Sequence, residues 1–278
     1  MASTEKVLIT GGSSGIGKQL AADFLRRGAH VTIVANEASK LRSAHADLSA
    51  ISPSVCALEC DVAVLAEVRR MAEEYLRKFG PPDVLVSNAG FAVYRLFQEM
   101  TSEEIERLLA VNFLGGCLIA REFLPLMVKA GRGHLVVMAS IAGRLVMTPC
   151  GVYSAAKHGL AAWAHTLKIE LKRTGVHVHL ICPGRVETNF FSHQSFVERE
   201  ARAEARFTVR VEDVSRATMA AIEKNRFMTY VPQSFGLLVW LADSFPFPVR
   251  MTLDRLMGAR VRSLDRSTKV ESNDAVIL

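Results

Sequence analysis

Apolar positions in the first 231 residues follow two alternating patterns. Short, nearly continuous apolar runs are typical of strands buried in a parallel sheet, and the longer segments between them have the composition and spacing of helices. The predicted strands are residues 6–10, 29–35, 55–60, 83–87, 133–140, 176–182 and 227–231. The predicted helices are residues 15–27, 38–50, 63–79, 102–130, 211–224 and a segment from Tyr153 to about residue 173. This alternation predicts right-handed crossovers and a doubly wound parallel α/β sheet in one domain, residues 1–232.

The pattern changes after about residue 232, so residues 233–278 are predicted to form a helical C-terminal extension. Its first part is apolar, and residues 249–264 place apolar side chains near helical spacing with four arginines among them. A basic amphipathic helix can lie on an anionic membrane surface. A helix that covers a substrate cleft, or a subunit interface, explains the pattern at least as well. Residues 268–278 are polar and are expected to fray.

The composition and charge of the chain argue against nucleic-acid binding and metal binding but do not identify a function. The chain has 278 residues, 50% of them apolar and 22% charged, with a formal charge of +6. Basic residues are interleaved with acidic ones and form no long block, so nucleic-acid binding is not expected. No spacing of Cys and His residues indicates a metal site.

The five cysteines are scattered along the chain, which favours buried free thiols in a reducing compartment. Cys150 lies close to Tyr153 in the sequence and could line a pocket, but packing is the preferred reading. The N-terminus shows no signal-peptide pattern, and no apolar run approaches the roughly 18 residues of a membrane span. A cytoplasmic location is therefore expected, with contact to a membrane surface through the extension as an addition.

A glycine-rich turn follows the first predicted strand and opens the first helix. Gly11, Gly15 and Gly17 allow a tight turn, a close approach of the backbone to a pyrophosphate, and close packing of helix on sheet. The helix N-terminus then offers free N–H groups to the phosphates. The position of the motif between strand and helix indicates a cofactor site rather than a simple turn.

Three proton-handling side chains are predicted to converge at the carboxyl edge of the sheet. Tyr153 and Lys157 are four residues apart and share a helix face. Ser140 ends the preceding strand, and the loop that contains Gly143 and Pro149 can bring it to that face. Open α/β sheets bind their ligands at this edge.

Five motifs in this order resemble the short-chain dehydrogenase/reductase family. They are Thr10 to Gly17, Asn88-Ala-Gly90, Ser140, Tyr153-x-x-x-Lys157 and Pro183-Gly184. The resemblance extends from about residue 6 to residue 231, and it implies a Rossmann-type fold and an NAD(P)-dependent oxidoreductase.

The resemblance also implies roles for four residues. Tyr153 would be the general acid/base, and Lys157 would favour its phenolate and hold the nicotinamide ribose. Ser140 would polarise the substrate carbonyl. Asn112 would hold a water for proton relay, although a buried asparagine that pairs with backbone is the structural alternative. A cofactor-sensing scaffold without catalysis is the alternative of another class.

The cofactor residues implied by the family follow the same motifs. Asp61 would accept from the adenine amino group; its structural alternative is the N-cap of the following helix, and both roles can coexist. Pro183 and the residues after it would meet the nicotinamide carboxamide. The full set comprises Gly11, Ser13, Ser14, Gly15, Ile16, Gly17, Asn36, Lys40, Asp61, Val62, Asn88, Ala89, Gly90, Tyr153, Lys157, Pro183, Gly184, Val186 and Thr188.

The end of the second strand favours NADP(H) over NAD(H). Family members that prefer NAD usually have an acid at the position of Ala35, and that acid is missing here. Members that prefer NADP often have arginine where this chain has Asn36. Lys40, one helical turn on, could reach a 2′-phosphate, whereas Glu37 counts against this.

The segments expected over the nicotinamide are mostly apolar, which favours a lipophilic ketone or secondary alcohol. They are residues 91–94, 144–149 and 189–191. The C-terminal extension, together with residues 35–41, resembles the branch that contains 3-ketosphinganine reductases and related acyl or lipid ketone reductases. The alternative is an NAD-dependent alcohol dehydrogenase of steroid or polyketide type. Family habit suggests a homodimer or homotetramer.

Overall fold

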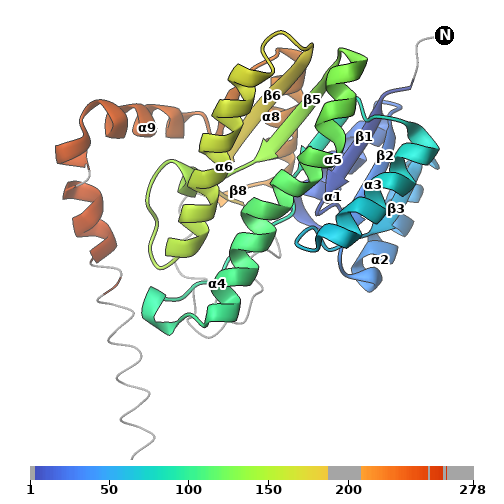
Figure 1. Cartoon of the computed structure of the whole chain (residues 1–278). Helices are drawn as coiled ribbons and strands as arrows, with labels where there is room; N and C mark the ends of the chain where they lie inside the picture. The colour runs from blue at the N-terminus through green and yellow to red at the C-terminus, as the bar shows by residue number, and fades with distance from the viewer. Residues whose placement is uncertain (1–3, 187–207, 250, 259–260, 262–278) are drawn as a thin grey trace, which may run out of the picture.

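A computed structural model describes residues 4–186, 208–249, 251–258 and 261 (Figure 1). Helices and strands alternate along most of the chain. The strands are β1 (Lys6–Thr10), β2 (His30–Ala35), β3 (Val55–Glu59), β4 (Val84–Ser87), β5 (Gly133–Met138), β6 (Val176–Pro183), β7 (Arg185–Val186), β8 (Thr208–Val209) and β9 (Met228–Val231). The α-helices are α1 (Gly15–Arg26), α2 (Ala38–Ser49), α3 (Leu65–Phe79), α4 (Ser102–Leu109), α5 (Gly115–Ala130), α6 (Gly151–Glu170), α8 (Val211–Glu223) and α9 (Ser234–Ser244).

Seven of these strands form one parallel sheet in the order β3-β2-β1-β4-β5-β6-β9. The chain builds outward from β1 in one direction and then crosses to β4 on the other side of β1. The strand order therefore reverses between β1 and β4, and a crevice opens at the carboxyl ends of these two strands. The predicted doubly wound α/β fold is confirmed.

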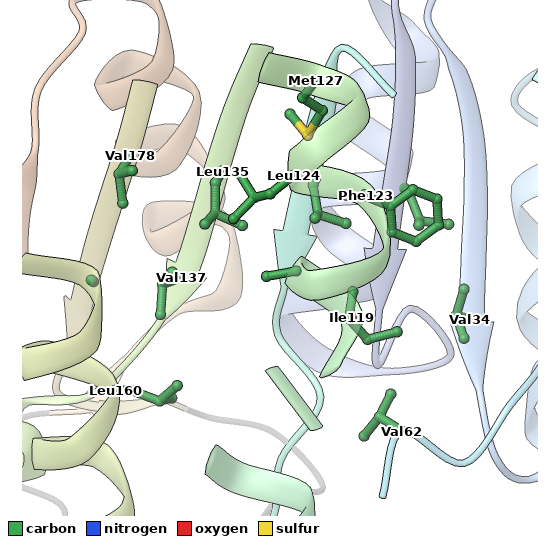
Figure 2. Packing of buried hydrophobic residues seen from close by; sticks show 14 of the residues in the cluster. Val34, Val62, Ile119, Phe123, Leu124, Met127, Leu135, Val137, Leu160 and Val178 are labelled. Carbon is green, nitrogen blue, oxygen red and sulfur yellow. The ribbon is translucent and has the colours of Figure 1, made fainter. Parts of the chain in front are cut away.

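Strand residues alternate between the two faces of the sheet, so both faces present apolar side chains. Among the described residues, three helices pack on each face. Leu8, Leu135 and Val137 face a core made with α3, α5 and α6. Val7 and Val136 face the second core, made with α1, α2 and α8. Figure 2 shows the first core. There, Leu124 of α5 lies beside Leu135 of β5, whereas Ile119 and Phe123 of α5 point to the other side, where Val34 of β2 lies.

Most differences from the predicted elements are small shifts at their ends, such as α3 beginning at Leu65 instead of residue 63. The predicted helix over residues 102–130 is continuous but not uniform, because a π-helical turn, η2 (Ala110–Leu114), separates α4 from α5. The two-residue strands β7 and β8 pair with each other and were not expected. Two residues are too short for an apolar pattern to indicate a strand.

One helical segment, residues 102–130, is long and apolar enough to cross a membrane by length and composition alone. No such segment was predicted from the sequence, because no continuous apolar run approaches the roughly 18 residues of a membrane span. In the fold, Ile119, Phe123 and Met127 are almost fully buried against the sheet. Core helices of water-soluble folds pass the same test, so this segment is weak evidence for a membrane span.

The C-terminal extension begins directly after β9 with α9, and residues 246–249 and 251–258 are also helical. The predicted helix over residues 249–264 is thus helical over 251–258, and most of its remainder lies outside the described residues. Val239 of α9 is buried with Ile141 and Leu145 from the segment that follows β5. The extension therefore packs beside the carboxyl edge of the sheet.

Candidate active site

A cavity of about 570 Å³ lies at the carboxyl edge of the sheet, where the strand order reverses. Its walls come from the glycine-rich turn, the segment after β4, the segment between β5 and α6, and the residues after β6. Most of the predicted site residues line it: Gly11, Ser14, Gly15, Ile16, Lys40, Asn88, Ala89, Gly90, Ser140, Tyr153, Lys157, Pro183, Gly184 and Val186.

The turn between β1 and α1 is pressed tightly against its surroundings. Gly11 has a φ of +66°, a region that favours glycine. A Cβ atom on Gly17 would lie 2.2 Å from the Gly11 carbonyl oxygen, so only glycine allows α1 to begin this close to the turn. Ser14, the N-cap of α1, makes no side-chain cap hydrogen bond. The first N–H groups of α1 are therefore available to an anion such as a pyrophosphate.

Asn88 ties the glycine-rich turn to the end of β4. Its Nδ2 donates to the carbonyl oxygens of Thr10 and Gly11, at 3.0 and 3.3 Å. The backbone N–H groups of Asn88 and Ala89 both donate to Thr10 Oγ1. These bonds hold the two halves of the crevice in a fixed relation.

Tyr153 and Lys157 lie in the first two turns of α6 and meet Ser140 from the end of β5. Lys157 is buried, its Nζ donates to the Met138 carbonyl oxygen at 3.0 Å, and Nζ lies 5.7 Å from the centre of the Tyr153 ring. Ser140 Oγ accepts from the N–H of Ala142 at 3.1 Å and also hydrogen-bonds Tyr153. The predicted convergence of these three side chains is what the fold produces.

Burial controls the protonation of this cluster. Loss of hydration raises the pKa of Tyr153 well above its usual value, and the hydrogen bond with Ser140 opposes this only in part. In the chain without cofactor, burial is the largest influence on the pKa of Tyr153, and the Lys157 ammonium donates to the Met138 carbonyl oxygen. That Lys157 and the positive nicotinamide of an oxidised cofactor favour the phenolate stays a prediction. Burial also lowers the pKa of Lys157, to about 8. Tyr153 therefore keeps its proton at neutral pH.

Asn112 lies in the π-helical turn η2, behind the cavity wall. Its Nδ2 donates to the carbonyl oxygens of Phe91 and Leu108, at 2.8 and 3.1 Å. Its Oδ1 is buried without a hydrogen-bond partner. A Cβ atom on Gly90 would lie 2.6 Å from Asn112 Oδ1 and 3.5 Å from Lys157 Nζ, so Gly90 leaves space beside both polar atoms. Asn112 thus pairs with backbone, as the structural alternative predicts, and its Oδ1 has no protein partner; its role in holding a water stays a prediction.

Several predicted site residues do not line the cavity. Gly17 and Val62 have packing positions, with Val62 against Gly115. Thr188 lies outside the described residues. The others away from the cavity lining are Ser13, Asn36, Asp61 and Asn112.

Asp61 is engaged by the protein itself. Its Oδ2 pairs with Arg107 at 2.7 Å, and its Oδ1 accepts from the N–H of Ala63 at 3.0 Å. The alternative reading of Asp61 as the helix cap is wrong, because α3 begins later and its N-cap is Val64. Its contact with adenine stays a prediction.

Lys40 does line the cavity, but it is not free there. Its Nζ forms an ion pair with Glu37 at 2.6 Å, and both side chains are at least half exposed. The hydrogen bond from Lys40 lowers the pKa of the Glu37 carboxyl, so the carboxylate is charged at neutral pH. Any anion that approaches Lys40 must compete with Glu37.

The cavity also contains residues that sequence reasoning placed elsewhere or missed. Cys150 lines the wall, although packing was the preferred reading. Met138 and Arg185 line it as well, and neither belongs to a motif that could have identified it. Among the described residues, no group of three or more His, Cys, Asp or Glu side chains could hold a metal ion.

The residues fit a dinucleotide. One crevice, where the strand order reverses, has close backbone contacts that only glycine allows and free N–H groups at the start of α1. The unpartnered Oδ1 of Asn112 lies next to it.

Comparison with known proteins agrees with this geometry. The family model for short chain dehydrogenase matches residues 5–198. A 1-deoxy-11-beta-hydroxypentalenate dehydrogenase from Streptomyces exfoliatus is 32% identical over 87% of this chain and 87% of its own length.

Two solved structures have the same fold over nearly their whole length. A short-chain dehydrogenase/reductase from Burkholderia phymatum in complex with NAD has a TM-score of 0.81 and 25% identity, covering 87% of this chain and 94% of that one. A short-chain dehydrogenase from Sphingobium yanoikuyae in complex with NADPH has a TM-score of 0.74 and 27% identity, covering 94% and 95%. This chain belongs to the short-chain dehydrogenase/reductase family and is an NAD(P)-dependent oxidoreductase.

Proposed function

We propose that the enzyme transfers hydride between NADP(H) and a ketone or secondary alcohol on a lipophilic molecule. The observation that carries this proposal is the makeup of the cavity wall around Tyr153 and Ser140. Phe91, Ala92, Ile141 and Met147 line it there, and no carboxylate lines any part of it among the described residues. An apolar wall with a few converging polar groups fits an apolar substrate with one oxygen to be oriented.

The roles of the chain's own residues follow from their positions. Ser140 and Tyr153 both present hydroxyl groups to one point of the cavity, where a carbonyl oxygen can accept from each. Because burial keeps Tyr153 protonated, its hydroxyl can give a proton to that oxygen as negative charge develops. A nicotinamide cofactor, when bound, supplies or takes up the hydride.

The proton lost by Tyr153 has a route for replacement. The Lys157 ammonium lies beside the tyrosine ring, and the unpartnered Asn112 Oδ1 shares the space next to Gly90. With a pKa of about 8, Lys157 is mostly protonated at neutral pH and can also give up a proton at small cost. A water held by Asn112 completes the path.

The preference for NADP(H) rests on Lys40 at the cavity rim and on the missing acid at Ala35. Glu37 weakens this preference through its ion pair with Lys40. NAD binding is the competing possibility, and the Burkholderia structure in complex with NAD is a case in the family.

A long-chain ketone of the 3-ketosphinganine kind is the substrate class we favour. Phe235 of α9 packs on Gly184, which lines the cavity, and this contact supports a role for the apolar extension beside a long substrate chain. The second candidate is an alcohol dehydrogenase of steroid or polyketide type. Its support is an 11-beta-hydroxysteroid dehydrogenase-like protein of Arabidopsis thaliana, 28% identical over 86% of this chain, and the structural similarity to an actinorhodin polyketide ketoreductase.

We place the enzyme in the cytoplasm. All five cysteines are free thiols, which suits a reducing compartment. A homodimer or homotetramer remains the expected assembly.

Replacing Tyr153 by Phe tests the catalytic assignment. The hydroxyl that transfers the proton is lost, so kcat should fall by about 10²–10⁴-fold while NADPH affinity, measured by fluorescence titration, stays nearly unchanged. Tyr94→Phe, which removes another hydroxyl from the same cavity, should cost less than about tenfold. Turnover by Tyr153→Phe close to that of the unmodified enzyme would rule out this mechanism.

The same assay, run on ketones of increasing chain length and on fused-ring ketones with both cofactors, tests the substrate class. We expect kcat/KM to rise with chain length and to be higher with NADPH. A preference for short hydroxy acids or sugars would contradict the proposal, and a preference for fused rings would favour the second candidate.

A further inference from the structure

The outer face of the C-terminal extension is apolar and exposed. Within α9, Leu237 is 62% exposed and Trp240 is 57% exposed, whereas Val239 on the opposite face is buried. Farther along, Phe247 is 78% exposed. This surface, here called the outer face of the extension, comprises Leu237, Leu238, Trp240, Phe245, Phe247, Met251 and Leu256.

The inner face of the same helix already has its partners. Phe235, Val239 and Ala242 pack on Ile141, Leu145 and neighbouring residues. The outer face therefore has no further protein surface to cover it within the described part of the chain. Figure 1 shows α9 running outward from β9, away from the helices that cover the sheet, with the next helix turned back beneath it.

A lipid surface fits the outer face better than a second copy of the chain does. Residues 234–242 contain no charged side chain, and the exposed positions offer almost no hydrogen-bonding group apart from the Trp240 ring. Interfaces between water-soluble proteins carry about one hydrogen bond per 100–200 Å² and a polar rim. A helix that is apolar around most of its circumference belongs in a core or in a lipid environment.

The chemistry at the end of α9 points to the boundary between lipid headgroups and acyl chains. Trp240 and Phe245 pack edge to face, with ring centres 6.4 Å apart. Aromatic rings concentrate at this boundary in membrane proteins. Residues 245–266 then carry five arginines against two aspartates, a sequence charge that attracts anionic headgroups.

We propose that the outer face of the extension docks on an anionic lipid surface, with α9 lying in the plane of the interface. Because the inner face of α9 contacts Ile141 and Gly184, docking places the cavity next to the lipid. Apolar burial anchors such a helix without a span, and arginines add an attraction that salt weakens. The docking stands on this surface alone, whatever ketone the enzyme uses.

Vesicle flotation of the full chain tests the proposal. We expect the protein to float with phosphatidylcholine vesicles that contain phosphatidylglycerol, to float much less with phosphatidylcholine alone, and to be released as salt rises. Leu237→Gln, Leu238→Gln and Trp240→Gln combined should lower partitioning by roughly tenfold or more, since each side chain buries substantial apolar area. Phe97→Gln with Ile169→Gln, two other exposed apolar positions, is the matched control and should float normally.

Tryptophan fluorescence locates the contact. The chain has two tryptophans, so Trp163→Phe leaves Trp240 as the single reporter. Brominated lipids should quench it, and its emission should shift to shorter wavelength on binding. Failure of the unmodified protein to float overturns the proposal. If the unmodified protein does not float and the triple variant loses an oligomer that the unmodified protein forms, the outer face belongs to a contact with a second copy. That result also overturns the proposal.

Vesicle binding is measured in the absence of substrate. NADPH-dependent turnover of a water-soluble ketone is measured in a separate assay. Failure of docking is therefore distinguishable from failure of the proposed reaction.

Discussion

Glu37, the N-cap of α2, forms an ion pair with Lys40 in the first turn of that helix, and Lys40 lines the cavity. Exposed pairs of this kind contribute only about 0–1 kcal/mol, so a ligand with more negative charge than one carboxylate can displace Glu37. The preference for NADP(H) therefore depends on whether the 2′-phosphate displaces the Glu37 carboxylate from the Lys40 ammonium.

Glu37→Gln should release Lys40 and lower KM for NADPH by about two- to fivefold, the equivalent of up to 1 kcal/mol. KM for NADH should hardly change, because NADH has no 2′-phosphate. Lys40→Ala should move KM for NADPH in the opposite direction. Steady-state kinetics with both cofactors measures these effects.

Asp47→Asn is the matched control, since it breaks another exposed pair, Lys18–Asp47 at 2.6 Å, and Lys18 does not line the cavity. Equal changes for the two cofactors in Glu37→Gln, or none, would leave Lys40 as a surface lysine.

At the scale of elements, α9 packs against the segment that follows β5 and forms an ion pair with it. Arg144, which follows the short 3-10 turn η3 (Ile141–Gly143), donates through Nη2 to Asp243 of α9 at 2.8 Å. Arg144 also hydrogen-bonds Tyr230, and its Nε is buried without a partner. The guanidinium therefore links η3, β9 and α9.

Asp243→Asn should loosen α9 without unfolding the domain. Removing a partly exposed ion pair costs about 0.5–1 kcal/mol, so amides of α9 should exchange hydrogen about two- to fivefold faster. Amides of α5 and β5 should exchange as before. Hydrogen exchange followed by mass spectrometry resolves these segments.

Asp254→Asn, an exposed change on the following helix, serves as the comparison and should leave exchange in α9 unaltered. Unchanged exchange in Asp243→Asn would mean that packing alone holds the helix.

For the whole molecule, the opposite end of the sheet carries a histidine cluster that links stability to pH. His134 Nδ1 lies 3.0 Å from His179 Nε2, and His179 Nδ1 lies 2.8 Å from the Arg226 carbonyl oxygen. Because a carbonyl only accepts, His179 Nδ1 carries the proton and its Nε2 accepts from His134. Burial lowers the pKa of His134 to about 4, and it lowers the pKa of His179.

A base with a depressed pKa binds fewer protons in the folded state than in the unfolded state. Its contribution to stability is therefore complete above the unfolded pKa, about 6.5, and is lost as pH falls toward about 4. We expect the free energy of unfolding in urea to drop by on the order of 1 kcal/mol between pH 7.5 and pH 5, after allowance for the partial exposure of His134.

His134→Gln removes one titrating group, so its stability should depend less on pH over that interval, whatever its stability at pH 7.5. The same pH dependence in the variant and in the unmodified protein would assign the effect to other groups.

The sequence by itself determined the sheet, the glycine-rich turn and the Tyr153–Lys157 pair. The reason is that apolar alternation, glycine-only turns and helical spacing are local properties, carried within one segment or between adjacent ones. The doubly wound parallel arrangement followed because strands and helices alternate and crossovers are right-handed, whereas the order of the strands came from the structure.

Tertiary structure alone decided which partner each polar side chain would find. Asp61 meets Arg107, Cys150 faces the cavity and Arg144 reaches Asp243, all through contacts between segments far apart in the chain. The π-helical turn at Asn112 and the inner face of α9 also depend on what packs against them. Local pattern cannot specify such pairings, because desolvation and hydrogen bonding depend on neighbours that only the complete fold brings together.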